Sequence, residues 1–237
     1  MTDSPRELAV ACGGAGRTRV VVTRRVAPRL RRRLWTLYVD AFASIEGRAV
    51  GTQMLEKPVF DALVDHPDTY KFLGFDEGHP AGMILLVDRL DLVPGVNACF
   101  FAERFPEQAV RGAVFYGVFA FVAPGSGRLR LYSALLGAAA QLAASRAGVI
   151  VIDMSRHLEE AGQVRLIERS VRGFPGVSVN EVDAQLFYAI TLPTPTDRAT
   201  GFDPSAVDVV IDLTEPEVEP EIATYGDVGA DTWGSTN

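Results

Sequence analysis

The chain has 237 residues, of which 48% are hydrophobic, so it is long enough to bury a sizeable core, as globular proteins do. No apolar run approaches the length of a membrane span, and the first residues lack the apolar stretch of a secretory signal. The two cysteines, Cys12 and Cys99, do not make a disulfide framework. We therefore expect a cytoplasmic protein with free thiols and no membrane association.

The net charge of -7 is unevenly distributed along the chain. Nine of the 30 acidic residues follow Arg198 and no basic residue does, which leaves 21 acidic against 23 basic residues before that point. Nine arginines fall within residues 6–33 without interleaved aromatic residues, so the pattern does not favour a nucleic-acid partner. The three histidines have no Cys or His at ligand spacing, and no metal site is predicted.

The first half of the chain predicts a mobile N-terminal segment, two helices and a β-hairpin. Residues 1–17 are the mobile segment. Proline in the first turn and a stripe of apolar residues predict the first helix. In order, the expected elements are a strand at Thr18–Val26, helices at Pro28–Ile45 and Leu55–Asp65, and hairpin strands at Tyr70–Phe75 and Ala81–Val87. Residues 88–111 are expected to be irregular, with a strand-like stretch at Val96–Phe101.

The most informative stretch is Gly112 to Asp153. Ala113 to Val122 is a continuous apolar run that predicts a strand buried on both faces. A Pro-Gly-Ser-Gly sequence breaks it, and helical spacing then runs from Leu129 to Gly148. Val149 to Ile152 predicts a second, parallel strand. The turn before the helix is where such a unit binds an anion on free backbone N–H groups, although a plain tight turn with solvated arginines is the alternative.

The last part of the chain predicts one more helix, two strands and a tail. The helix runs from Leu158 to Gly173, and the strands are Val177–Val182 and Ala184–Leu192. Residues 196–237 form an acidic, mostly disordered tail, in which only Val207 to Leu213 alternates as a strand would.

The central unit resembles the coenzyme A-binding core of the GNAT (GCN5-related N-acetyltransferase) superfamily. The resemblance rests on Val122-Ala123-Pro124 at the strand end, on Ser133-Ala134-Leu135-Leu136 at family spacing, and on the order of elements over residues 18–192. Between the two motifs the sequence departs from the family pattern. The family's basic position falls on Gly127, and its two glycines fall on Arg130 and Tyr132, where side chains would obstruct close approach of a pyrophosphate.

The resemblance implies a fold and a cofactor. It implies that residues 18–195 form a GNAT-like α/β (α+β) domain, with a mixed, centrally splayed sheet of about six to seven strands flanked by about four helices. Gly117 is then either the bulge that starts the splay or a small residue needed for packing. Acetyl-CoA or another acyl-CoA would be held by residues of the strand end and turn: Phe121, Val122, Gly125, Ser126, Gly127, Arg128, Leu129 and Arg130.

The activity implied is acyl transfer from acetyl-CoA to an amine of a small molecule or a protein. The usual acid and base of the family are missing, because the central strand carries no acid and Arg169 stands where a tyrosine is common. Tyr116 and Asp153 are candidate substitutes, with core packing and a turn role as the alternatives. A GNAT-like domain without catalysis, serving binding or assembly, is the second functional hypothesis. A homodimer stays open.

Overall fold

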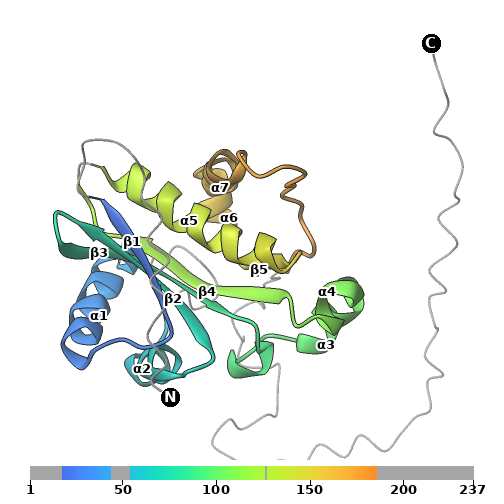
Figure 1. Ribbon diagram of the computed structural model, residues 1–237, viewed down its shortest axis with the longest axis horizontal. Coiled ribbons are helices and arrows are strands. Elements are labelled where there is room, and N and C mark those ends of the chain that lie inside the picture. The colour runs from blue at the N-terminus through green and yellow to red at the C-terminus, as the bar shows by residue number, and fades with distance from the viewer. Residues whose placement is uncertain (1–17, 44–53, 126, 186–237) are drawn as a thin grey trace, which may run out of the picture. The chain divides into compact units, whose positions relative to one another are not determined.

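The computed structural model describes residues 18–43, 54–125 and 127–185 (Figure 1). The predictions for residues 1–17, for Ser126, for nearly all of Ala184–Leu192 and for the tail at 196–237 lie outside these residues.

A five-stranded sheet organises the described residues, in the order β1-β2-β3-β4-β5. The first three pairings are antiparallel and β4 pairs with β5 in parallel, so the predicted mixed α/β fold is confirmed. The strand count of five is below the expected six to seven. The strands are β1 (Arg19–Thr23), β2 (Thr69–Asp76), β3 (His79–Val87), β4 (Val114–Val122) and β5 (Val149–Ile152).

The predicted strand at Val177–Val182 is wrong. These residues have no strand conformation, and Val177 and Val179 are exposed. Alternating valines give a stretch the propensity for a strand, but a strand forms only where another strand offers its hydrogen-bonding edge.

Helices cover both faces of the sheet (Figure 1). α1 (Pro28–Phe42) and α2 (Lys57–Asp65) pack on one face, and each has proline in its first turn, where the missing N–H costs nothing. α5 (Arg128–Ser145) crosses the other face, with α7 (Gln163–Val171) packed against it. The helices at 28–45, 55–65 and 129–148 are thus confirmed, with boundaries shifted by a few residues.

Two predictions about helices are corrected. Residues 88–111 are not irregular, because they contain a 3-10 turn, η1 (Leu90–Leu92), and the helices α3 (Ala98–Arg104) and α4 (Pro106–Val110). The strand-like stretch from Val96 becomes helix because the Asn97 side chain caps α3 by accepting a hydrogen bond from the Phe100 N–H at 3.2 Å. The last helix is divided into α6 (Arg156–Glu160) and α7, because Gly162 adopts a left-handed conformation with φ of 90°. The described residues therefore hold seven α-helices instead of about four.

A β-bulge divides β4 in two. Leu85 of β3 pairs with Phe119 and Leu86 pairs with Gly117, so Val118 is an extra residue on β4. The extra residue reverses the alternation of side chains. As a result Tyr116 and Phe119 point to the same face of the sheet, although they are three positions apart and would face opposite sides in a regular strand.

The two faces of the sheet are packed differently. Beneath α1 and α2 lies an aromatic cluster in which the Tyr38 ring is 5.1 Å from both Phe60 and Phe119. On the other face α5 lies close to the backbone of β2 and β3. A Cβ on Gly74 would be 2.8 Å from a methyl of Leu131, and a Cβ on Gly82 would be 3.2 Å from a methyl of Leu135. These two glycines set the height of α5 above the sheet.

Candidate functional site: the diverging strands and the start of α5

The strands β4 and β5 part at Gly117. Their parallel pairing runs from Val114 with Val149 to Gly117 with Ile152 and ends there. A Cβ on Gly117 would be 2.8 Å from Cγ2 of Ile152, so a glycine is needed for this last pair to stay in contact. The bulge predicted at Gly117 is present beside it, and the close approach shows that the packing alternative holds as well, whereas the splay stays a prediction because β5 ends at this last pair.

Beyond the bulge, β4 has an open edge. Among the described residues, Val118 to Val122 pair only with β3, and no described strand takes up the main-chain N–H and C=O groups on the opposite side of this segment. This is the arrangement that an extended ligand can use by adding itself to a strand.

The open edge leads directly into the turn before α5. Gly125 has φ of 151° and Gly127 has φ of 85°, both in the region that favours glycine. Gly127 is the N-cap of α5 and has no side chain to accept hydrogen bonds from the amides of the first turn. The positive end of an 18-residue helix therefore faces the turn without a capping side chain.

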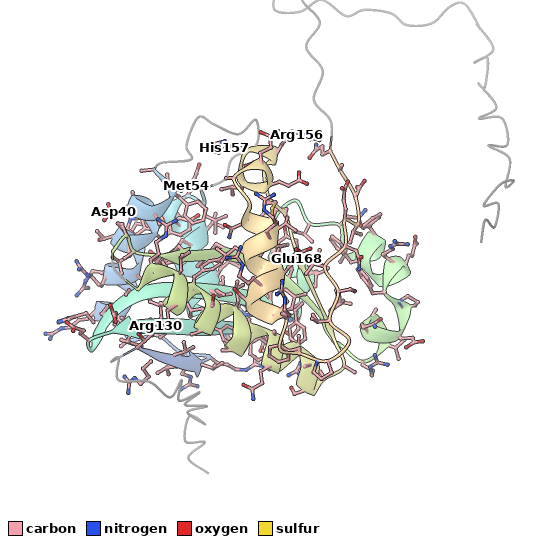
Figure 2. All side chains as sticks on the ribbon, turned by 90° about the horizontal axis from the view of Figure 1, so that it is seen from above. Asp40, Met54, Arg130, Arg156, His157 and Glu168 are labelled. Atoms are coloured by element: carbon pink, nitrogen blue, oxygen red, sulfur yellow. The ribbon has the colours of Figure 1, made fainter. Side chains whose placement is uncertain are left out.

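Two exposed arginines reinforce the positive charge at this helix end. Arg128 is the first residue of α5, and Arg130 folds back so that its Nη2 atom comes within 3.4 Å of the position a Cβ on Gly127 would take. Figure 2 shows Arg130 at the beginning of α5, away from Arg156 and His157 on α6. Leu129, between them, is 62% exposed. Neither guanidinium forms an ion pair with a carboxylate in the part of the chain that the structure describes.

A small hollow of about 60 Å³ lies beside the turn, on the side of β2 and β3. It is large enough to hold a water molecule. Asp76 is part of its lining, as is Arg128, so the hollow contains side chains of both charges. The residues around it are Asp76, Ala81, Val122, Ala123, Pro124, Gly125, Gly127, Arg128 and Leu131.

The predicted cofactor-binding residues thus divide into two groups. Gly125, Gly127, Arg128 and Arg130 surround the start of α5. The Phe121 side chain, by contrast, is 3% exposed and packs into the aromatic cluster, so only its main chain is available at the open edge. The burial of the Phe121 side chain could not be predicted from the sequence, because the bulge determines which side chains of β4 face the aromatic cluster.

Tyr132 does not occupy the turn. It lies in the second turn of α5, it is buried, and its hydroxyl accepts a hydrogen bond from Nε2 of Gln163 on α7. Ser133 and Ser170 join the same two helices through a hydroxyl contact of 2.9 Å. The ring expected to obstruct a pyrophosphate is therefore directed towards α7 instead.

The candidate catalytic residues Tyr116 and Asp153 are in contact. The Tyr116 hydroxyl donates a hydrogen bond of 2.6 Å to Oδ1 of Asp153, which follows the last residue of β5. Burial, and then the hydrogen bond to Asp153 and its charge, raise the pKa of Tyr116 far above its ordinary value. Tyr116 therefore keeps its proton and acts as a hydrogen-bond donor, while the Asp153 side chain remains exposed.

Sequence reasoning missed the residues that surround Tyr116 on its far side. Phe101 of α3 lies with its ring centroid 6.4 Å from that of Tyr116, and Phe105 packs in the same cluster. The two phenylalanines could have indicated this contact in the sequence, since aromatic residues in a connection between strands need a surface to pack on.

Two general properties complete the description. Over the described ranges no group of three metal-ligating side chains comes together. Within the same ranges no helix is long and apolar enough to cross a bilayer.

Comparison with known proteins gives matches among solved structures alone. No family model matches the chain, and no curated protein matches it. An aminoglycoside acetyltransferase from an uncultured soil metagenomic sample, in complex with sisomicin, is similar with a TM-score of 0.45 and 12% identity over 74% of this chain and 97% of that one. The aminoglycoside acetyltransferase AAC(6')-Iy in complex with a bisubstrate analogue has a TM-score of 0.43 and 15% identity, over 73% and 99%. The ribosomal-protein-alanine N-acetyltransferase of Brucella melitensis biovar Abortus 2308 has a TM-score of 0.40 and 12% identity, over 73% and 99%.

These matched structures are all acetyltransferases. With TM-scores below 0.5 they do not identify the family, the substrate or the cofactor of this chain. The function is therefore argued from the geometry of the site.

Proposed function

We propose that this protein is an N-acyltransferase that uses acetyl-CoA or another acyl-CoA and transfers the acyl group to an amine. The observation that carries the proposal is the open edge of β4 ending at the uncapped start of α5. One end of this path offers main-chain hydrogen bonds to an amide-containing chain, and the other end offers positive charge to phosphates.

The residues present fit coenzyme A at the phosphate end. Arg128 and Arg130 are exposed, and the Arg130 guanidinium folds back over the N-cap residue. Charge-assisted hydrogen bonds from guanidinium to phosphate oxygens are among the strongest polar contacts that proteins make. The bound coenzyme would supply an acyl thioester. The side chain of Tyr132 does not oppose this fit, because it packs against α7.

Asp153 is the residue of this chain that we expect to manage the proton of the amine. Its Oδ1 atom is held by the Tyr116 hydroxyl, which leaves Oδ2 to bind the ammonium group and to accept its proton. Tyr116 positions the carboxylate and does not itself release a proton, because its pKa is raised. Asp153 directly follows Ile152, the last β5 residue paired with β4, so the carboxylate lies where the strands part.

Titration calorimetry with acetyl-CoA tests the phosphate end. We expect binding that weakens about tenfold or more in Arg128→Ala and again in Arg130→Ala, since each removes charge-assisted bonds of roughly 1.5–3 kcal/mol. Arg165→Ala, on α7, is a matched arginine control that should leave binding unchanged. Equal affinities in the wild type and in both variants would remove this turn from the site.

A non-catalytic binding module is the second candidate. Asp76 in the hollow beside Arg128 favours it, because a carboxylate there disfavours a bound phosphate. Asp76→Asn separates the two candidates. In an acyl-CoA enzyme this variant should bind acetyl-CoA as well as or better than the wild type does. Absence of acetyl-CoA binding in both proteins would favour the module.

A further inference from the structure

The helical connection between β3 and β4 places two aromatic rings beyond Tyr116. Phe101 lies 6.4 Å from Tyr116 between ring centroids, and Phe100 lies 5.2 Å from Phe101 with the rings at 82°. Phe100 is 37% exposed. Three rings therefore lead from solvent on α3 to the central strand, and Figure 1 shows α3 and α4 beside the start of β4.

Tyr116, the innermost of the three rings, is hydrogen-bonded to a carboxylate. The Tyr116 hydroxyl is 2.6 Å from Oδ1 of Asp153, and the Asp153 side chain is exposed. In the described part of the chain its hydrogen-bond partner is Tyr116, and no Lys or Arg of these residues neutralises it by an ion pair.

The cluster beneath the rings is buried and apolar. Tyr116 packs among valines of β4, β5 and the loop after η1, and Phe101 and Phe105 pack against this cluster. The buried members of the cluster are Val87, Leu90, Val93, Val114, Tyr116 and Val151. A surface of this kind holds the outer ring in place, so a ligand that packs on it gains burial without having to order the protein first.

A carboxylate beside a short row of aromatic rings matches one kind of amine. The ammonium group binds the carboxylate, and an attached ring or chain packs on the aromatic faces and edges. A polycationic acceptor would instead need several carboxylates converging on it, whereas this path offers rings and valines. We propose that the acceptor is a primary amine bearing an aryl group, with its nitrogen on Asp153 and its ring on Phe100 and Phe101. That this amine is the acyl acceptor rests on the proposed function, whereas its binding does not.

Direct binding tests the proposal with three probes: 2-phenylethylamine, ethylamine and 2-phenylethanol. Titrations use the full chain, with and without coenzyme A. We expect 2-phenylethylamine to bind about tenfold or more tightly than ethylamine, because its ring is removed from water. We expect 2-phenylethanol to bind more weakly than 2-phenylethylamine, because it lacks the charge that Asp153 recognises.

Variants identify the surface. Phe100→Ala should bring the affinity for 2-phenylethylamine close to that for ethylamine and leave the affinity for ethylamine unchanged. Val110→Ser is the matched control, since Val110 is 90% exposed on the neighbouring α4 and should affect neither amine. Asp153→Asn should weaken both amines.

The outcomes separate this inference from the proposed function. Equal affinities for the two amines, no effect of Phe100→Ala, or no binding of any probe would overturn the inference. Binding of 2-phenylethylamine without acyl transfer to it from acetyl-CoA would overturn the proposed function and leave the amine site standing. Acyl transfer to amines with no preference for an aryl group would overturn the inference and leave the proposed function standing.

Discussion

The two halves of β4 show how one strand serves two purposes. Val114 to Gly117 pairs with β5, its last two residues, Tyr116 and Gly117, pair with β3 as well, and its side chains are buried or half-buried on both faces. Val118 to Val122 pairs with β3 alone among the described residues. A single extra residue, Val118, separates the half that pairs with β5 from the half that, within the described ranges, pairs on one side alone. The core beneath the second half stays covered, because Phe119 and Phe121 are buried.

The aromatic support of the open half should be the most sensitive point. Phe119 lies 5.1 Å from Tyr38 and 5.4 Å from Phe60 between ring centroids, and it is 6% exposed. Phe119→Ala should lower the free energy of unfolding by about 3–5 kcal/mol, because it leaves a cavity among these rings. Urea unfolding monitored by circular dichroism measures the loss. A loss below about 1 kcal/mol would show that α1 and α2 do not support the open half.

A substitution at Gly117 tests the boundary between the two halves of β4 directly. Gly117→Val adds atoms where a Cβ alone is already 2.8 Å from Ile152. We expect a loss of about 2–3 kcal/mol by overpacking, as β5 is pushed away from β4.

Gly137→Ala is the control for Gly117→Val, because no atom lies within 4 Å of a Cβ at that helical position. This control should raise stability by about 0.5–1 kcal/mol, since alanine favours the helix. Unchanged stability in Gly117→Val would mean that the strands tolerate a wider separation than their contact implies.

A buried lysine in the same row of paired residues as Phe119 should make the stability of the open half depend on pH. Lys71 pairs with Leu85, which pairs with Phe119. The Lys71 side chain is fully buried, and its Nζ atom donates to the carbonyls of Arg24 at 2.7 Å and His66 at 2.5 Å. Burial, and then the charge of Arg24, lower the pKa of Lys71 to about 8.

The pH effect has a definite sign. Between pH 8 and the ordinary lysine pKa, the unfolded chain binds more protons than the folded one, so stability should rise with pH from about 8 towards 10. The rise should amount to about 1–3 kcal/mol and be absent in Lys71→Met. Above pH 10 the tyrosines with raised pKa values act the other way, because the unfolded tyrosines lose protons first. Urea unfolding at several pH values from 7 to 10 measures the free energy of unfolding. A value that does not change with pH in the wild type would show that Lys71 is not desolvated.

The smallest expected change in stability comes from a substitution in the half of β4 that pairs with β5, Val114 to Gly117. Tyr116→Phe removes the hydrogen bond to Asp153 and keeps the ring in its cluster, so the loss of stability should be about 1 kcal/mol. In the proposed enzyme the same change should lower kcat more than it raises KM for the amine, because a carboxylate with one fewer bond is less well placed. A change in stability without any change in kcat would reduce Tyr116 to a core residue.

The sequence could predict the parts of the site that depend on local chemistry. The apolar run of β4, the glycine turn and the helical spacing of α5 are encoded in neighbouring residues, and all three were predicted. Gly117 could be singled out because glycine inside a buried strand is unusual. The contact between Tyr116 and Asp153 could not be derived in the same way, because it depends on the parallel register of β4 and β5.

The failures have physical reasons of the same kind. The stretch around Phe100 has strand-forming residues. It forms a helix because the Asn97 side chain caps the first turn. Val177–Val182 has the right alternation but no strand beside it in the described residues. The direction of the Tyr132 ring depends on Gln163 of a helix that lies about thirty residues away in sequence. Each error arose where a partner distant in the chain decides the outcome.

The pair of glycines under α5 bears on how this fold tolerates change in its sequence. Gly74 and Gly82 are directly opposite each other on β2 and β3, and they let the leucines of α5 rest close to the sheet. The position of the helix end is thus determined by residues that need never meet a ligand. The turn itself is then free to vary in sequence, because its length and composition can change without displacing the helix.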